Sequence, residues 1–188
     1  MKKILAGQVL LILCCAFYLI WWYRGYRPGV SADRVGGLNG VLLLITAALG
    51  ITGMLCSLGS IEMKTALRLD PHRIVVMGLI TYILLLLITR LGFHRIVTTE
   101  LFLIVGWTTL ELTVVNRLLA AGCLTDAGFR AMCAVIAAAF TISIVFYVAY
   151  YRMEEMKAFY AAMIPLVTEA ATMGILVILY STGKAGAV

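Results

Sequence analysis

The sequence predicts an all-α fold, a polytopic membrane bundle of about six transmembrane helices that forms a single integral membrane domain over residues 1–188. Two observations predict it. Apolar residues make up 63% of the chain and charged residues only 13%, whereas a soluble domain is about half apolar and a quarter charged. Apolar stretches of about 20 residues, the length that crosses the hydrocarbon core of a bilayer, also recur between short polar connections.

The first expected span covers residues 4–23. It begins like a signal peptide, with two lysines before an apolar run, but no small-residue cleavage motif follows the run. The run ends in an aromatic cluster and a cation, which is typical of headgroup depth: Trp21, Trp22, Tyr23 and Arg24. We therefore interpret this segment as a retained transmembrane helix.

Five further spans follow from the same pattern. We expect them over residues 36–59, 74–93, 99–121, 128–151 and 158–181. Glycine, proline and charged residues gather in the connections, where they commonly end helices. Small residues inside the spans, such as Gly50 and Gly53, let helix backbones approach each other closely in lipid.

The net charge of +6 does not indicate a nucleic-acid partner, because the basic residues lie at span ends and in short loops rather than in one basic block. At span ends they suit the anionic headgroups of a lipid bilayer. Lysine and arginine are balanced between the two faces of a six-span chain, so the positive-inside rule does not distinguish between the two orientations in the membrane. The expected location is a cytoplasmic membrane of the bacterial type, with both termini on the cytoplasmic face.

The balance of charge between the two faces has three explanations. Insertion in both orientations would give an antiparallel homodimer, and an internal duplication would give a 3+3 inverted repeat of the kind found in transporters. Sliding the second half over the first aligns Arg24 with Arg117 and residues 62–64 with 155–157. Chance explains so few identities equally well, so all three explanations stay open.

Two acidic residues near span centres are the main functional lead. Glu111 lies in the fourth span and Glu169 in the sixth. A charged side chain at the centre of a bilayer costs about 2.5–3.5 kcal/mol on insertion scales, so such residues usually face a partner, a cavity or a pathway. The alternative is that each glutamate is protonated and has a structural role, in which it hydrogen-bonds to a neighbouring helix. The sequence leaves both interpretations open.

Polar residues of the fourth span follow the spacing of a helix. Thr108 lies one turn before Glu111, and Asn116 and Arg117 continue a neighbouring polar stripe, so this helix should face the bundle interior. Arg117 either extends outward to the headgroups or pairs with Glu169 of the sixth span.

The sixth span contains a proline close to its acid. Pro165 stands one turn before Glu169, and Thr172 lies one turn after it. Proline has no backbone N–H, so the carbonyl of Ala161 is expected to lose its helical partner. Transporters line binding sites with interrupted helices of this kind.

No residue pattern predicts a catalytic, cofactor or metal site. His72 and His94 lie in loops without the cysteine or acid spacing of a zinc site, and the five cysteines form no C-x-x-C pair. Aromatic residues at the span ends, which include Trp22, Tyr147 and Tyr150, fit interface anchors. The alternative for them is an aromatic cage around an organic cation.

The sequence thus favours a small transporter or channel for a small solute or cation, coupled to protons. Glu111 and Glu169 would exchange protons or bind the cation. The residues expected to complete the site are Thr108, Asn116, Arg117 and Thr172. The alternative is a non-catalytic membrane subunit of a larger transporter, sensor or secretion complex, and a lipid-modifying enzyme is favoured least. The expected partners are the lipid bilayer, the solute or cation, and either a second copy or a larger membrane complex.

Overall fold

Seven α-helices form in the computed structural model, which describes residues 2–29, 37–59, 62–92 and 99–183. They are α1 (Lys2–Tyr26), α2 (Gly37–Ser57), α3 (Pro71–Gly92), α4 (Thr99–Ala120), α5 (Asp126–Tyr150), α6 (Glu155–Ala161) and α7 (Ile164–Gly183). Six helical segments are long and apolar enough to cross a membrane, because α6 and α7 together make the last one. The prediction of an all-α, six-span membrane protein is confirmed.

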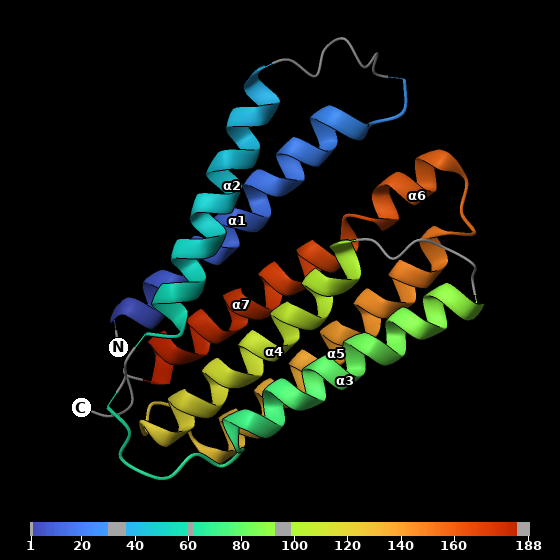
Figure 1. The fold of residues 1–188 in the computed structure, drawn as a ribbon. Helices are drawn as coiled ribbons and strands as arrows, with labels where there is room; N and C mark the ends of the chain where they lie inside the picture. Colours follow the sequence, from blue (N-terminus) through green and yellow to red (C-terminus); the bar gives the residue numbers. More distant parts are fainter. Residues whose placement is uncertain (1, 30–36, 60–61, 93–98, 184–188) are drawn as a thin grey trace.

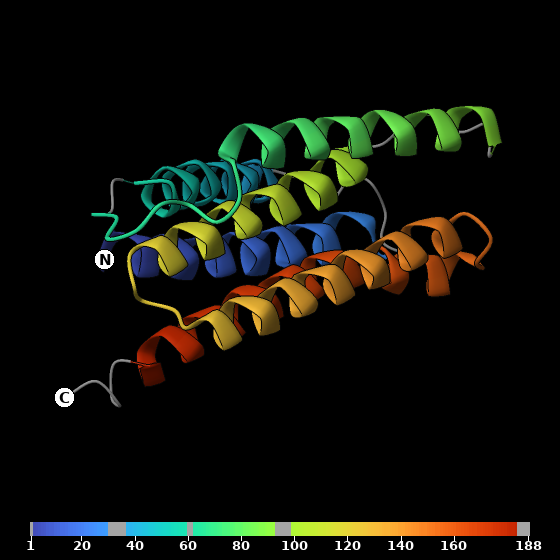
Figure 2. The same ribbon diagram turned by 90° about the horizontal axis from the view of Figure 1, so that it is seen from below.

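The helices form an antiparallel bundle with both described chain ends on one side. Helix α1 begins at the end of the bundle where α7 finishes, which we call the terminal end (Figure 1). Helix α6 lies at the opposite end, the α6 end. The centre consists of α1, α4, α5 and α7, while α2 packs along the outside of α1 and α3 along the outside of α4 (Figure 2).

Apolar side chains from the four central helices form the main core. Leu11, Val114, Met132 and Met173, one from each of these helices, are fully buried. Helix α4 is the most enclosed span, as its polar stripe predicted, whereas α3 is the least enclosed. Most large aliphatic side chains of α3, such as Met77 and Leu79, are exposed, which suits contact with lipid acyl chains.

Glycine sets the distance between α1 and α2. A methyl group on Gly7 would lie 2.5 Å from the backbone nitrogen of Ser57, and one on Gly53 would lie 2.8 Å from the side chain of Leu11. The two backbones can approach this closely because neither glycine carries a side chain. The contact at Gly53 agrees with the role expected for small residues in this span.

The last span is interrupted next to its proline. Helix α6 ends at Ala161, and α7 begins at Ile164, directly before Pro165. Between them the N–H of Met163 donates to the carbonyl of Tyr160 at 3.1 Å, a tighter 3₁₀-type bond instead of an α-helical one. The span also begins at Glu155 rather than at the predicted residue 158, since the chain forms a separate short helix there.

The arrangement of the helices gives no support to an inverted repeat. In a 3+3 repeat, α2 and α3 of the first half would correspond to α5 and α7 of the second. Helix α5 packs along α7, whereas α2 and α3 do not pack along each other in the described part of the chain. The two halves therefore differ in which of their helices touch.

Candidate carboxyl site

The two predicted glutamates lie close together inside the bundle. Glu111 of α4 is completely buried, and Glu169 of α7 is 3% exposed. Their carboxyl groups are near enough to interact electrostatically, and the side chain of Gln8 of α1 lies beside Glu111. Cys15 of α1 is near both acids. We call Gln8, Cys15, Glu111 and Glu169 the carboxyl cluster.

Most oxygen atoms of the carboxyl cluster lack a protein partner. The amide of Gln8 donates to the hydroxyl of Ser57 at 3.3 Å. Within the described residues, both carboxyl oxygens of Glu111, Oε1 of Glu169 and Oε1 of Gln8 have no hydrogen-bond partner. Buried polar atoms are nearly always paired in folded proteins, because leaving them unpaired away from water is unfavourable. The cluster is therefore suited to hold protons, water molecules or a bound cation.

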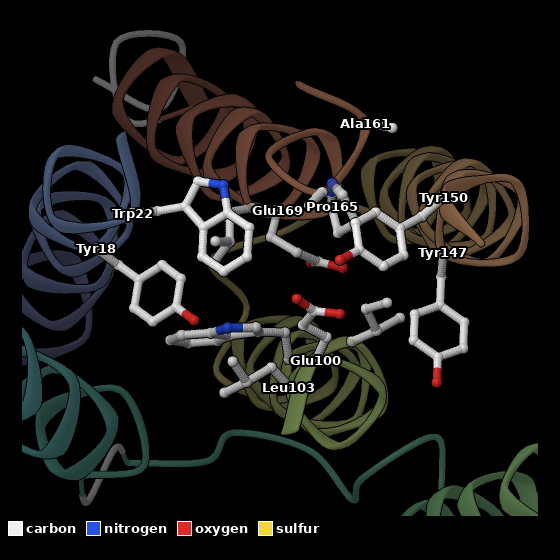
Figure 3. Close-up of a pocket in the computed structure, with 13 residues that line it drawn as sticks. Tyr18, Trp22, Glu100, Leu103, Tyr147, Tyr150, Ala161, Pro165 and Glu169 are labelled. Carbon is white, nitrogen blue, oxygen red and sulfur yellow. The ribbon is translucent and has the colours of Figure 1, made fainter. Parts of the chain in front are cut away.

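A cleft reaches the cluster from the α6 end. It lies between α1, α4, α5 and the α6–α7 break, and Glu169 forms part of its lining. Glu100, in the first turn of α4, also lines it, and Figure 3 shows both carboxyl groups turned toward the space between the helices. Besides aliphatic residues such as Leu103 and Leu166, the lining includes five aromatic residues: Tyr18, Trp22, Trp107, Tyr147 and Tyr150. We call this space the aromatic cleft.

The break in the last span forms one wall of the aromatic cleft. Ala161, Ala162 and Pro165 line it with short side chains that leave space between the helices. Proline suits the first turn of α7, because the N–H groups there have no partner within the helix. Glu169 follows one turn later and lies on the same face of α7. The break thus makes room in the cleft and directs the carboxyl group into it (Figure 3).

A smaller cavity approaches the cluster from the terminal end. It is lined by residues of α1, α4 and α7, among them Gln8, Leu118 and Tyr180. Gln8 belongs both to this cavity and to the carboxyl cluster. Cavities therefore reach the cluster from the two ends of the bundle, one at Glu169 and the other at Gln8.

Asn116 and Arg117 hold the connection between α2 and α3. The side-chain amide of Asn116 donates to the carbonyl of Leu69 at 2.7 Å and accepts from the N–H of Leu69 at 3.0 Å. The guanidinium of Arg117 donates to the carbonyl of Leu58 at 2.5 Å. Arg117 is thus bound to the backbone just beyond α2 rather than paired with Glu169. These partners favour a supporting role for both residues.

The two predicted threonines use their hydroxyl groups within their own helices. Thr108 donates to the carbonyl of Ile104, and Thr172 donates to the carbonyl of Thr168. Thr172 is buried in the turn that follows Glu169. Thr108 instead lines a wide groove between α3 and α4, together with Gly78 of α3. The structure therefore keeps Thr172 near the cluster and directs Thr108 elsewhere.

Several residues of this region were not predicted as site residues. Gln8 is a polar residue inside an otherwise apolar run, and that contrast was a usable signal. Glu100 shares the helical stripe of Glu111 but lies at the start of its span, where an acid suits the helix dipole. For Trp22 and Tyr150 the sequence favoured interface anchors and gave an aromatic cage as the alternative, and the structure places both in the cleft lining.

Comparison with protein-family models, curated proteins and solved structures finds no match for the chain. In the described residues no group of three or more His, Cys, Asp or Glu side chains is arranged to hold a metal ion. The carboxyl cluster and the two cavities that approach it are therefore the features that bear on function.

Proposed function

We propose that this six-span protein transports a small solute or cation across the membrane and couples its movement to protons. The observation that carries the proposal is the pair of neighbouring buried acids, Glu111 and Glu169, whose oxygens are largely unpaired and which cavities approach from both ends. We further propose a cytoplasmic membrane of the bacterial type, with both termini on the cytoplasmic side.

The two acids would act in sequence along the bundle. Glu169 lines the aromatic cleft and exchanges protons or cations with the α6 end. Glu111 interacts with Glu169 and lies beside Gln8, which lines the cavity at the terminal end. A proton or cation held by this pair can therefore be offered to either end, provided that the apolar core around the pair opens to one side at a time. Asn116 and Arg117 would support the helix that carries Glu111.

Proton movement into liposomes tests this proposal. Purified protein is reconstituted with a trapped pH-sensitive dye, and internal pH is followed after the addition of potassium, sodium, ammonium-type cations or small neutral solutes. We expect at least one of these to drive proton movement, and we expect Glu111→Gln and Glu169→Gln to abolish it. Glutamine keeps the size of the side chain and removes its exchangeable acidic proton.

Glu154→Gln is the matched control. Glu154 is exposed and pairs with Lys157 at 2.9 Å, and exposed ion pairs contribute little to stability. This variant should move protons like the wild type. Unchanged proton movement in both buried-acid variants would refute the proposal.

A second candidate function is that of an accessory subunit in a larger membrane complex. The groove between α3 and α4 favours it, because this groove is wide and is lined in part by short polar residues such as Thr81. Such surfaces let another transmembrane helix pack closely. Two results together would favour this function. The folded, reconstituted protein would move no solute or proton, and the protein in its native membrane would be part of a complex of defined larger mass.

A further inference from the structure

We propose that the aromatic cleft is a binding site for a monovalent organic cation, an ammonium group with short apolar substituents. The inference rests on the proposed transport function, for which it names the substrate class. Three properties of the cleft lead to it: the sign of its charge, the chemistry of its walls and its small volume.

The charged groups of the cleft are acidic. Glu169 is almost fully buried, its Oε1 has no partner among the described residues, and Figure 3 shows its carboxyl group directed into the cleft. Glu100 contributes a second acid from α4, close to Tyr18. The described lining contains no lysine or arginine. The carboxyl groups of the described lining would repel an anion, and a cation would neutralise a buried carboxylate.

The walls of the cleft are aromatic on opposite sides. Tyr18 and Trp22 come from α1, and Tyr147 and Tyr150 come from α5 (Figure 3). Trp107 of α4 completes this lining. Aromatic faces attract cations, and quaternary ammonium groups are typically recognised by several such rings. A neutral solute would leave the buried carboxyl group of Glu169 without a counterion from the described lining.

The polar atoms of the cleft are too few for a bare metal ion. Hard cations such as calcium need six or more oxygen ligands, and no metal-binding group of His, Cys, Asp or Glu exists in the described residues. The hydroxyl of Tyr147 already accepts a hydrogen bond from Tyr151 at 3.2 Å. The cleft has a volume of about 30 Å³, room for about two water molecules, so an ammonium group with short substituents enters with the smallest shift of the lining side chains. Charge, aromatic faces and volume therefore agree on a small alkylammonium group.

Tryptophan fluorescence offers a direct binding assay. The chain has three tryptophans, and two of them, Trp22 and Trp107, line the cleft. In a Trp21→Phe background, all tryptophan emission comes from the cleft. The probes are choline chloride, its uncharged carbon analogue 3,3-dimethyl-1-butanol, and potassium chloride at equal ionic strength.

We expect choline to change the emission with a saturating dependence, and the uncharged analogue and potassium to have no saturating effect. Glu169→Gln should weaken choline binding by about tenfold or more, because a close opposite charge is lost. Tyr150→Leu should weaken it by about threefold through the loss of one aromatic face. Glu154→Gln and Tyr160→Leu, at exposed positions outside the cleft lining, are the matched controls and should bind like the parent.

Three outcomes contradict the inference. Equal binding of the uncharged analogue would make the cleft an apolar slot for lipid or detergent, and a saturating response to potassium alone would make it a site for inorganic cations. If Glu169→Gln left the affinity for choline unchanged, Glu169 would not be part of the choline site. Choline binding without proton movement in liposomes would support the cation site in the aromatic cleft and refute coupled transport. Proton movement that potassium drives and that depends on the two glutamates, without choline binding, would support coupled transport and refute the organic-cation site.

Discussion

Replacing Glu111 by methionine should make the protein more stable and inactive at the same time. Glu111 is completely buried in α4, and neither of its carboxyl oxygens has a hydrogen bond of regular geometry in the described residues, although the side chain of Gln8 interacts with it. A residue that stabilises the bundle would not be left in this state. A residue that is retained for proton or cation exchange can be left unpaired, since many functional sites are maintained at a cost in stability.

The size of this effect follows from the state of the carboxyl group. A buried polar group without a partner costs about 1–3 kcal/mol. Methionine has a similar length, is flexible and fills irregular spaces, so it should leave little cavity or overlap. Glu111→Met should therefore raise the free energy of unfolding by about 1–3 kcal/mol.

Reversible unfolding in mixed micelles of mild detergent and SDS, followed by circular dichroism, measures this free energy. Asn116→Leu is the matched comparison on the same helix, because both groups of the Asn116 amide are bonded to Leu69. It should lower the free energy of unfolding by about 1–3 kcal/mol. A loss of more than about 1 kcal/mol in Glu111→Met would refute the reasoning and make Glu111 a structural strut.

Gly7→Ala should destabilise the protein by about 1–3 kcal/mol in the SDS assay, because its methyl group would meet the backbone of α2. The control is Gly40→Ala, where nothing lies within 4 Å and the effect on stability should be below about 0.5 kcal/mol. Pro165→Ala restores a backbone N–H, so hydrogen exchange around residues 161–167 should slow, and unchanged exchange would contradict a break caused by proline. In single-cysteine variants, half-buried Cys123 should react with a maleimide in mild detergent, whereas buried Cys15 should react only after unfolding in SDS; equal rates would contradict the described burial.

The spans and the break in the last span were predictable because they depend on local properties of the chain. A run of about 20 apolar residues crosses a bilayer whatever its neighbours are, so all six spans could be located. The missing N–H of Pro165 interrupts helical bonding in any surroundings. The interior position of Glu111 followed from the cost of placing an acid in lipid.

The partners of the polar residues were not predictable, because they depend on how the helices pack. Asn116 bonds to Leu69, which lies 47 residues earlier in the chain, and no local pattern connects them. Spans that are apolar on every side also give little indication of which face turns inward. Trp22 and Tyr150 lie at the α6 end, where an interface belt and the lining of a cleft have the same sequence signature.

The contacts at the terminal end of α4 bear on how the chain is assembled during synthesis. The carbonyl of Ala120, which the helix itself leaves unpaired, accepts hydrogen bonds from the N–H groups of Lys64 and Thr65 at 2.8 and 3.0 Å, and Asn116 holds Leu69 in the same connection. The segment that precedes α3 is therefore anchored to residues that the ribosome has not yet made when α3 leaves it. Helices α1 and α2 can pair as soon as they are inserted, whereas α3 must wait in the membrane, or be held by the insertion machinery, until α4 is complete.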